Sequence, residues 1–338
     1  MRHPSPGRRS LLLALPALAL ARRAGAAPAA FGPALAQAAA LPQLRTLIVA
    51  RGGTVLLERR FSGPPPERPV NVKSVSKAVI AALVGAAIAR GVLEGTEQRI
   101  APLLRASLPR DADPRLEQVT IGHLLSMQAG LERTSGPYYG AWVTSRDWVR
   151  AALARPFVAD PDGPMLYSTG NSHLLSAILT RRTGRSTLAL ARDWLGGPLG
   201  IEIPPWPRDP QGIHFGGNDM LLSPRALLRF AEMHRQGGRW QGAEVLPEAW
   251  VRACWTPRTR SAFTGDAHGY GWFLDRPRGE DRAYAWGYGG QMAHVLPGLE
   301  ASIVMTSDPA QPSGGAGGHA RALHALVEEA LIPALRAA

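Results

Sequence analysis

The segment that most constrains this chain runs from Ser74 to Ile88, because every residue after Lys77 is apolar or glycine. A helix that is apolar on every face has to be buried on every side, since no face remains for water. The segment is also shorter than the roughly 20 residues that span a bilayer. The chain must therefore fold around this helix as a large globular body. Its 338 residues, 45% hydrophobic and 19% charged, are enough for such a core.

The only two lysines of the chain, Lys73 and Lys77, lie at the start of this segment, among 38 basic residues in all. Arginine stays protonated, whereas the amine of a buried lysine can lose its proton and act as a base. Ser74 lies three residues before Lys77, so the two side chains share one side of the predicted helix. Burial among apolar residues lowers the lysine pKa. The spacing predicts that Lys77 deprotonates Ser74. The alternative is a solvated lysine in an ordinary first helical turn, and Ser76, which faces elsewhere, is the weaker nucleophile candidate.

Residues 1–26 predict an export signal. Arg8 and Arg9 precede an apolar run from Leu11 to Leu20, and Ala24-Gly25-Ala26 offers a cleavage site. Either Sec or twin-arginine export fits, and both predict a periplasmic or secreted protein with no stable membrane anchor. The leader contains five arginines and no acid, so the remainder carries a net charge of +7. That charge forms no basic cluster of the kind that binds nucleic acid.

Strand patterns occur at both ends of the remaining chain and helical patterns between them. Leu44 to Phe61 alternates around Arg51-Gly52-Gly53, which predicts a β-hairpin. Further strands are expected over 270–273, 283–287, 293–295 and 301–306, and helices fill a region of about 95–215. Residues 27–43 predict an Ala/Pro-rich arm. The single Cys254 allows no internal disulfide.

Two segments resemble motifs of the serine β-lactamase and penicillin-binding-protein superfamily. Ser74-Val75-Ser76-Lys77 opens an apolar helix, and Val119-Thr120-Ile121-Gly122-His123-Leu124-Leu125-Ser126-Met127 follows it in the superfamily's order. The resemblance is strongest to the class C-like branch of esterases, D-aminopeptidases and 6-aminohexanoate-dimer hydrolases. It implies an α+β fold over residues 44–338, an antiparallel sheet flanked by helices, with the helical region of about 95–215 inserted in the α/β part.

A third segment, Pro164 to Asn171, is similar to the Tyr-x-Asn motif of that branch. Tyr167 takes the tyrosine position, and a phenol beside a lysine ammonium is biased toward phenolate, which can move a proton between serine and leaving group. Thr169 stands where the family has asparagine, so either its hydroxyl or Asn171 is expected to contact the substrate. Asn218 is a further substrate contact that the resemblance implies.

The fourth segment, Trp286-Gly287-Tyr288-Gly289-Gly290-Gln291, occupies the place of the family's Lys-Thr-Gly or His-x-Gly motif, with Gly290 as the final glycine. Glycines there let a substrate lie along the strand edge. The match implies an oxyanion hole made by the backbone N–H groups of Ser74 and Gln291, and substrate contacts at Tyr288, Gly289 and Gly290. Tyr288 replaces the usual cation, which favours substrates other than β-lactams and D-Ala-D-Ala peptides.

Together these residues predict an exported serine hydrolase without cofactor or metal, which cleaves a small amide or ester through an acyl-enzyme on Ser74. Lys77 and Tyr167 are the expected acid and base. A β-lactamase or D-Ala-D-Ala carboxypeptidase is the first alternative, and a non-catalytic penicillin-binding-like protein is the second. No nucleic-acid partner is expected, and the sequence leaves the oligomeric state open.

Overall fold

The computed structural model describes residues 29–314 and 318–338. The predicted signal peptide over residues 1–26 lies outside the described residues. In the described ranges, no helix combines the length and the apolar character that crossing a membrane requires. Part of the stretch that we expected to be an arm is instead packed: Phe31 and helix α1 (Gly32–Ala39) are anchored in the core, with Phe31, Ala34 and Ala38 fully buried.

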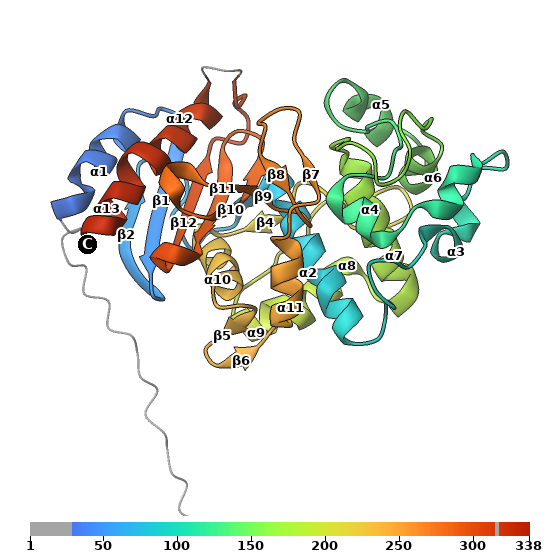
Figure 1. Cartoon of the computed structure of the whole chain (residues 1–338), viewed down its shortest axis with the longest axis horizontal. Helices are drawn as coiled ribbons and strands as arrows, with labels where there is room; N and C mark the ends of the chain where they lie inside the picture. The colour runs from blue at the N-terminus through green and yellow to red at the C-terminus, as the bar shows by residue number, and fades with distance from the viewer. Residues whose placement is uncertain (1–28, 315–317) are drawn as a thin grey trace, which may run out of the picture.

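Eight antiparallel strands form one sheet in the order β2-β1-β12-β11-β10-β9-β8-β7 (Figure 1). Their bounds are β1 Leu44–Arg51, β2 Thr54–Arg60, β7 Thr259–Arg260, β8 Ala267–His268, β9 Phe273–Asp275, β10 Arg282–Gly287, β11 Gln291–Leu296 and β12 Ala301–Ser307. The hairpin predicted around Gly52 and Gly53 is confirmed, and both glycines have the positive φ that suits them to a tight turn. The last strand of the chain, β12, lies between β1 and β11.

Helices cover both faces of this sheet, and successive strand residues alternate between the two cores, as the pleat requires. Leu47 and Val49 of β1 face α1, α12 (His319–Ala325) and α13 (Ile332–Ala337), which lie together on one side of the sheet (Figure 1). Ile48 and Ala50 face the other, larger core, which contains α2 (Ser76–Ala89) and α10 (Pro224–Arg235). The prediction of an α+β fold with a helix-flanked antiparallel sheet is confirmed.

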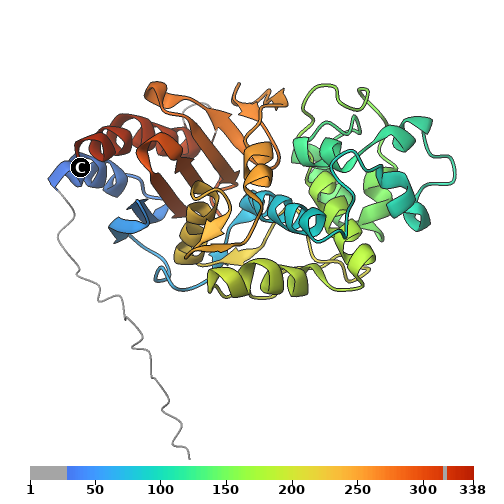
Figure 2. The same cartoon turned by 60° about the horizontal axis from the view of Figure 1, so that its bottom comes forward.

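The helical region packs on the far side of α2 from the sheet, so that α2 lies between the two parts of the molecule (Figure 2). Its longest helix, α7 (Thr169–Thr183), contacts α2 and ends at Gly184, whose φ is +65°. The remaining helices and strands are α3 Ile100–Leu103, α4 Ile121–Ser126, α5 Tyr139–Val143, α6 Trp148–Leu153, α8 Thr187–Ala191, α9 Gly197–Leu199, α11 Glu248–Cys254, β3 Val70–Asn71, β4 Leu221–Leu222, β5 Arg239–Trp240 and β6 Ala243–Glu244.

Helix α2 is buried on all sides, as its sequence predicts: every residue from Ser76 to Ala87 is inaccessible or nearly so. The packing leaves no spare room, because a Cβ added at Gly85 would lie 2.2 Å from the indole nitrogen of Trp250. A helix enclosed in this way is rigid, and its first turn can hold side chains in a fixed geometry.

Candidate active site

Ser74 lies in a short 3-10 turn, Lys73–Val75, immediately before α2. Lys73 has a φ of +51°, a conformation that is strained for a residue with a side chain and that must be held by its surroundings. Ser76 provides part of that support: its hydroxyl donates to the Lys73 carbonyl at 2.5 Å and accepts the Met220 N–H at 3.1 Å. Ser76 therefore holds the turn, and the hydroxyl of Ser74 is left at the cavity surface.

Lys77 has three polar neighbours. Its Nζ lies 3.0 Å from Ser74 Oγ, 3.3 Å from Thr169 Oγ1 and 2.6 Å from the Gly217 carbonyl oxygen. The side chain is only 4% exposed, and burial lowers the pKa of Lys77 to about 7, with the nearby Asp219 carboxylate acting in the opposite direction. A neutral amine has two N–H groups and one lone pair. If the N–H groups point at Gly217 and Thr169, the lone pair faces the Ser74 hydroxyl.

Tyr167 also packs against Lys77, and the distance from Lys77 Nζ to the centre of the Tyr167 ring is 4.8 Å. Burial raises the pKa of Tyr167 to about 12, and a hydrogen bond with Ser74 acts in the opposite direction but less strongly. The expected bias toward phenolate is therefore not found, because burial of the phenol outweighs the effect of a lysine amine that is only about half protonated near pH 7. The geometry instead places a neutral phenol, a proton donor, beside the serine.

Thr169 is the first residue of α7 and fills the position of the family's asparagine. Its hydroxyl contacts Lys77 and also Ser135 Oγ at 2.9 Å, while its backbone N–H donates to Ser135 Oγ at 2.8 Å. Asn171, the other residue that we considered for this role, is buried and does not line the cavity. Of these two candidates, the structure brings only Thr169 to the Ser-Lys pair.

The turn between β10 and β11 meets Ser74 at Gly287. A Cβ added at Gly287 would lie 2.5 Å from the Val72 carbonyl oxygen and 3.1 Å from the Ser74 nitrogen. Tyr288 lines the cavity. In the described part of the chain, the backbone N–H groups of Ser74 and Tyr288 donate to no other group, which is what an oxyanion hole needs.

Gly289, Gly290 and Gln291, which were expected to contact the substrate or the oxyanion, are not part of the cavity wall. The Gly289 N–H donates to Ser313 Oγ at 2.8 Å, and a Cβ at Gly290 would collide with His319 and Leu323. The Gln291 side chain is tied to the backbone of Ser307 at 3.0 and 3.1 Å. It is Gly287, and not Gly290, that lies against Ser74, which favours the Tyr288 N–H over the Gln291 N–H as the second oxyanion donor. The run contains three glycines, and its sequence alone does not say which one meets Ser74.

Three charged residues of the cavity wall, Lys73, Asp219 and Arg133, were not identified from the sequence. Lys73 Nζ forms an ion pair with Asp219 Oδ1 at 3.0 Å, and Asn71 Nδ2 donates to the same oxygen at 2.7 Å. The neighbouring Asn218, an expected substrate contact, donates to the Tyr139 hydroxyl at 2.9 Å and lines the cavity. Because the chain has only two lysines, the sequence could have pointed to Lys73 as a site residue. Asp219 is one of 26 acidic residues, and nothing in the sequence distinguishes it from the others.

These groups open into one cavity of about 750 Å³ between the sheet and the helical region. Its walls come from segments far apart in the sequence, and they include Lys73, Ser74, Arg133, Ser135, Tyr139, Tyr167, Thr169, Asn218, Asp219, Phe263, Phe273, Trp286 and Tyr288. Phe263 and Tyr288 are 66% and 51% exposed and form an aromatic rim. Among the residues that the structure describes, no group of three or more His, Cys, Asp or Glu side chains is placed to hold a metal ion.

Comparison with known proteins agrees with this geometry. A family model described as Beta-lactamase matches residues 38–327. A 6-aminohexanoate-dimer hydrolase from Paenarthrobacter ureafaciens is 24% identical over 307 residues, which cover 83% of this chain and 76% of that protein. Two solved structures share the fold at 17% identity. EstCE1, a hydrolase with promiscuous acyltransferase activity, has a TM-score of 0.71 and matches 89% of this chain and 96% of its own. The octameric penicillin-binding protein homologue from Pyrococcus abyssi has a TM-score of 0.69 and matches 89% and 75%. The chain therefore belongs to the β-lactamase family and is a serine hydrolase.

Proposed function

We propose that the protein cleaves small amides or esters through an acyl-enzyme on Ser74. The observation that carries this proposal is the contact of 3.0 Å between Ser74 Oγ and a buried Lys77 amine whose pKa is about 7. A base with a pKa near the working pH combines the right protonation state with useful basicity. Burial of a lysine amine costs free energy, and a lysine with only a structural role would not need to be buried beside a serine hydroxyl.

In the proposed reaction, Lys77 takes the proton of Ser74 as Oγ attacks the substrate carbonyl carbon. The backbone N–H groups of Ser74 and Tyr288 stabilise the negative charge on the carbonyl oxygen. The neutral phenol of Tyr167 gives its proton to the departing amine or alkoxide and recovers one from the Lys77 ammonium. Water then attacks the acyl-enzyme by the same steps, and the acid product leaves while Ser74 regains its proton.

The names of the relatives and the cavity walls guide the choice of substrate. Since the curated relative is named a 6-aminohexanoate-dimer hydrolase, linear amides of that type are the first substrates to try. The wall also contains Arg133, whose guanidinium stacks 5.4 Å over Phe263 and has no ion-pair partner among the described residues. This cation favours substrates with a carboxylate and supports a second candidate function, β-lactamase or D-Ala-D-Ala carboxypeptidase.

The site also bears on the remaining alternative, a non-catalytic binding protein. Ser74, Lys77 and Tyr167 are in contact, and both oxyanion donors are unoccupied by protein groups in the described chain, which argues for turnover.

We further propose that the protein is exported, on the basis of the predicted leader over residues 1–26. Fractionation of cells that express the full chain, followed by N-terminal sequencing, tests that proposal.

Hydrolysis of p-nitrophenyl butyrate by the protein and by its Ser74→Ala variant tests the catalytic proposal. We expect turnover that is lost in the variant, and an increase in intact mass by one acyl group when the wild-type protein is trapped with a slow substrate. Incubation with a penicillin separates the second candidate: a trapped or hydrolysed penicillin supports it. Equal turnover by both proteins would exclude Ser74 as the nucleophile.

A further inference from the structure

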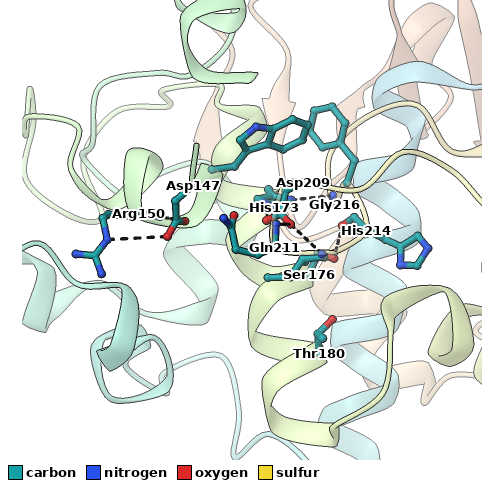
Figure 3. A network of polar contacts seen from close by, with 12 residues as sticks. Asp147, Arg150, His173, Ser176, Thr180, Asp209, Gln211, His214 and Gly216 are labelled. Carbon is teal, nitrogen blue, oxygen red and sulfur yellow. Dashed lines mark hydrogen bonds and ion pairs between the residues drawn. The ribbon is translucent and has the colours of Figure 1, made fainter. Parts of the chain in front are cut away.

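A histidine-aspartate pair, His173 and Asp209, lies buried beside the segment that contains Gly216 (Figure 3). His173 Nε2 is 3.0 Å from Asp209 Oδ2, and both side chains have an exposed fraction of zero. The rings of Trp142, Trp148 and Phe215 pack around the imidazole. Burying a polar pair among aromatic rings is unfavourable unless every polar atom is satisfied, so the hydrogen bonds of this pair are informative.

Those hydrogen bonds select one tautomer of the imidazole. Asp209 Oδ1 accepts the backbone N–H groups of Gln211 and Ile213 at 2.9 and 2.8 Å. The other oxygen, Oδ2, faces His173, and an ionised carboxylate can only accept, so Nε2 carries the ring proton. The unprotonated Nδ1 is then the acceptor for the Gly216 N–H at 3.4 Å. Asp209 thus determines which nitrogen of His173 is available to Gly216.

The residue after Gly216 is Gly217, which contacts Lys77 directly. The carbonyl of Gly217 accepts from Lys77 Nζ at 2.6 Å. The segment lies so close to α7 that a Cβ at Gly216 would be 2.1 Å from the Ser172 carbonyl oxygen, and one at Gly217 would be 2.8 Å from Thr169 Cγ2. A displacement of a few tenths of an ångström in this segment would therefore reach both Lys77 and Thr169.

We propose that the His173–Asp209 pair is a positioning device for the catalytic lysine. The tautomer that Asp209 imposes on His173 holds Gly216, and Gly217 in turn keeps its carbonyl on Lys77, so that the lysine lone pair faces Ser74. His173 and Asp209 are positioning residues, since neither lines the cavity. The inference rests on the proposed function in assuming that Lys77 is the base for Ser74.

Asp209→Asn tests the tautomer step with little change in shape. The single amide oxygen is needed by the Gln211 and Ile213 N–H groups, so the NH₂ group faces His173 Nε2 and donates to it. The ring proton then moves to Nδ1, where it opposes the Gly216 N–H, and two donors face each other. We expect Gly217 to withdraw from Lys77, which removes an acceptor that stabilises the ammonium form.

The readout is the titration of Lys77 itself, which this chain makes unusually accessible because it has only two lysines. Protein labelled with ¹³C at lysine Cε gives two NMR signals, and Lys73→Arg assigns them. We expect Lys77 to titrate at about pH 7 in the wild type and lower by about one unit in Asp209→Asn, since a hydrogen bond to a charged group contributes about 1.5 kcal/mol. The other groups that face Lys77 are Asp219, Tyr167 and His268, and none of them is altered.

Two further variants separate positioning from loss of stability. His173→Asn keeps an amide oxygen close to the position of Nδ1 and should retain a Lys77 titration near the wild-type value. Ser176→Ala removes a different support of the same loop, the hydrogen bond of 2.7 Å to the His214 carbonyl, without touching the tautomer. We expect Ser176→Ala to lower the melting temperature while the Lys77 titration and kcat change little.

Kinetics complete the test. In Asp209→Asn, kcat on p-nitrophenyl butyrate should fall about tenfold or more while KM is retained, because the substrate contacts are untouched. An unchanged Lys77 titration in Asp209→Asn, or an equal change in Ser176→Ala, would overturn the inference. The NMR titration needs no turnover, so failure of the proposed function, seen as activity that survives Ser74→Ala, remains a separate result.

Discussion

Gly287→Ala is the sharpest test of how the β10–β11 turn meets Ser74, the proposed nucleophile. The added methyl group would lie 2.5 Å from the Val72 carbonyl oxygen, about 0.9 Å short of ordinary contact, and 3.1 Å from the Ser74 nitrogen. The φ of Gly287 is not in the left-handed region, so alanine is conformationally allowed and the effect is one of space alone. Since Val72 and Ser74 belong to a turn fixed by Ser76, the strand end has to move away.

The expected effect follows from the geometry of oxyanion stabilisation. Donors act at about 2.7–3.1 Å, and removing one from an oxyanion hole lowers kcat by about 10²- to 10³-fold. Displacing the Tyr288 N–H by most of an ångström should therefore lower kcat on p-nitrophenyl butyrate by about that factor, with a smaller change in KM. The assay is steady-state hydrolysis, with circular dichroism to show that the variant is folded.

Two glycine variants serve as controls. Gly140→Ala adds a methyl group in open space on α5 and should leave kcat unchanged. Gly290→Ala meets His319 and Leu323 on the other side of the turn, where φ is +93°, and should reduce stability more than it reduces kcat. If Gly287→Ala kept full activity while Gly290→Ala lost it, the oxyanion donor would be Gln291, as the sequence alone suggested, and not Tyr288.

Three further predictions concern charge. Because only the neutral amine can take the Ser74 proton and the pKa of Lys77 is about 7, kcat/KM should fall about tenfold between pH 8 and pH 6; a flat profile, measured at the isosbestic wavelength of p-nitrophenol, would contradict this. Folding lowers the pKa of Lys77 from 10.5 to about 7, so between these values the unfolded chain binds more protons and the free energy of unfolding rises with pH, by up to about 1.4 kcal/mol per unit. Urea unfolding at pH about 7.5 and about 9.5 should show this rise in the wild type and lack it in Lys77→Met. Arg133→Gln should reduce the preference for mono-p-nitrophenyl adipate over p-nitrophenyl hexanoate by up to about fivefold, as expected for a partly exposed charge pair, whereas Arg276→Gln, outside the cavity, should not.

The features that could be predicted from the sequence are local ones. The burial of α2 follows from an unbroken apolar run, and the contact of Ser74 with Lys77 follows from a three-residue spacing that any helical turn would close. The β1–β2 hairpin follows from two glycines between alternating residues. Each of these depends on neighbours within one or two turns of chain, where the backbone leaves few choices.

The features that could not be predicted depend on tertiary placement. Which glycine of the 287–290 run meets Ser74 is decided by the point at which β10 crosses the turn before α2, and no local pattern marks that point. The protonation of Tyr167 depends on how deeply it is buried, and the charges beside the site, Asp219 and Arg133, converge from separate loops. Residues 27–43 were expected to be an arm because alanine and proline dominate them, yet Phe31, Ala34 and Ala38 pack into the core.

The position of β12 in the sheet has a consequence for how the protein is synthesised. Leu44 pairs with Ser307, so the N-terminal hairpin can join the sheet only after nearly the whole chain has left the ribosome. Contacts this distant in sequence form slowly, because closing a long loop precedes any gain from pairing. The edge of β1 that pairs with β12 therefore has no partner strand until the end of translation, and chaperones that bind unfolded chains have that whole interval in which to bind it.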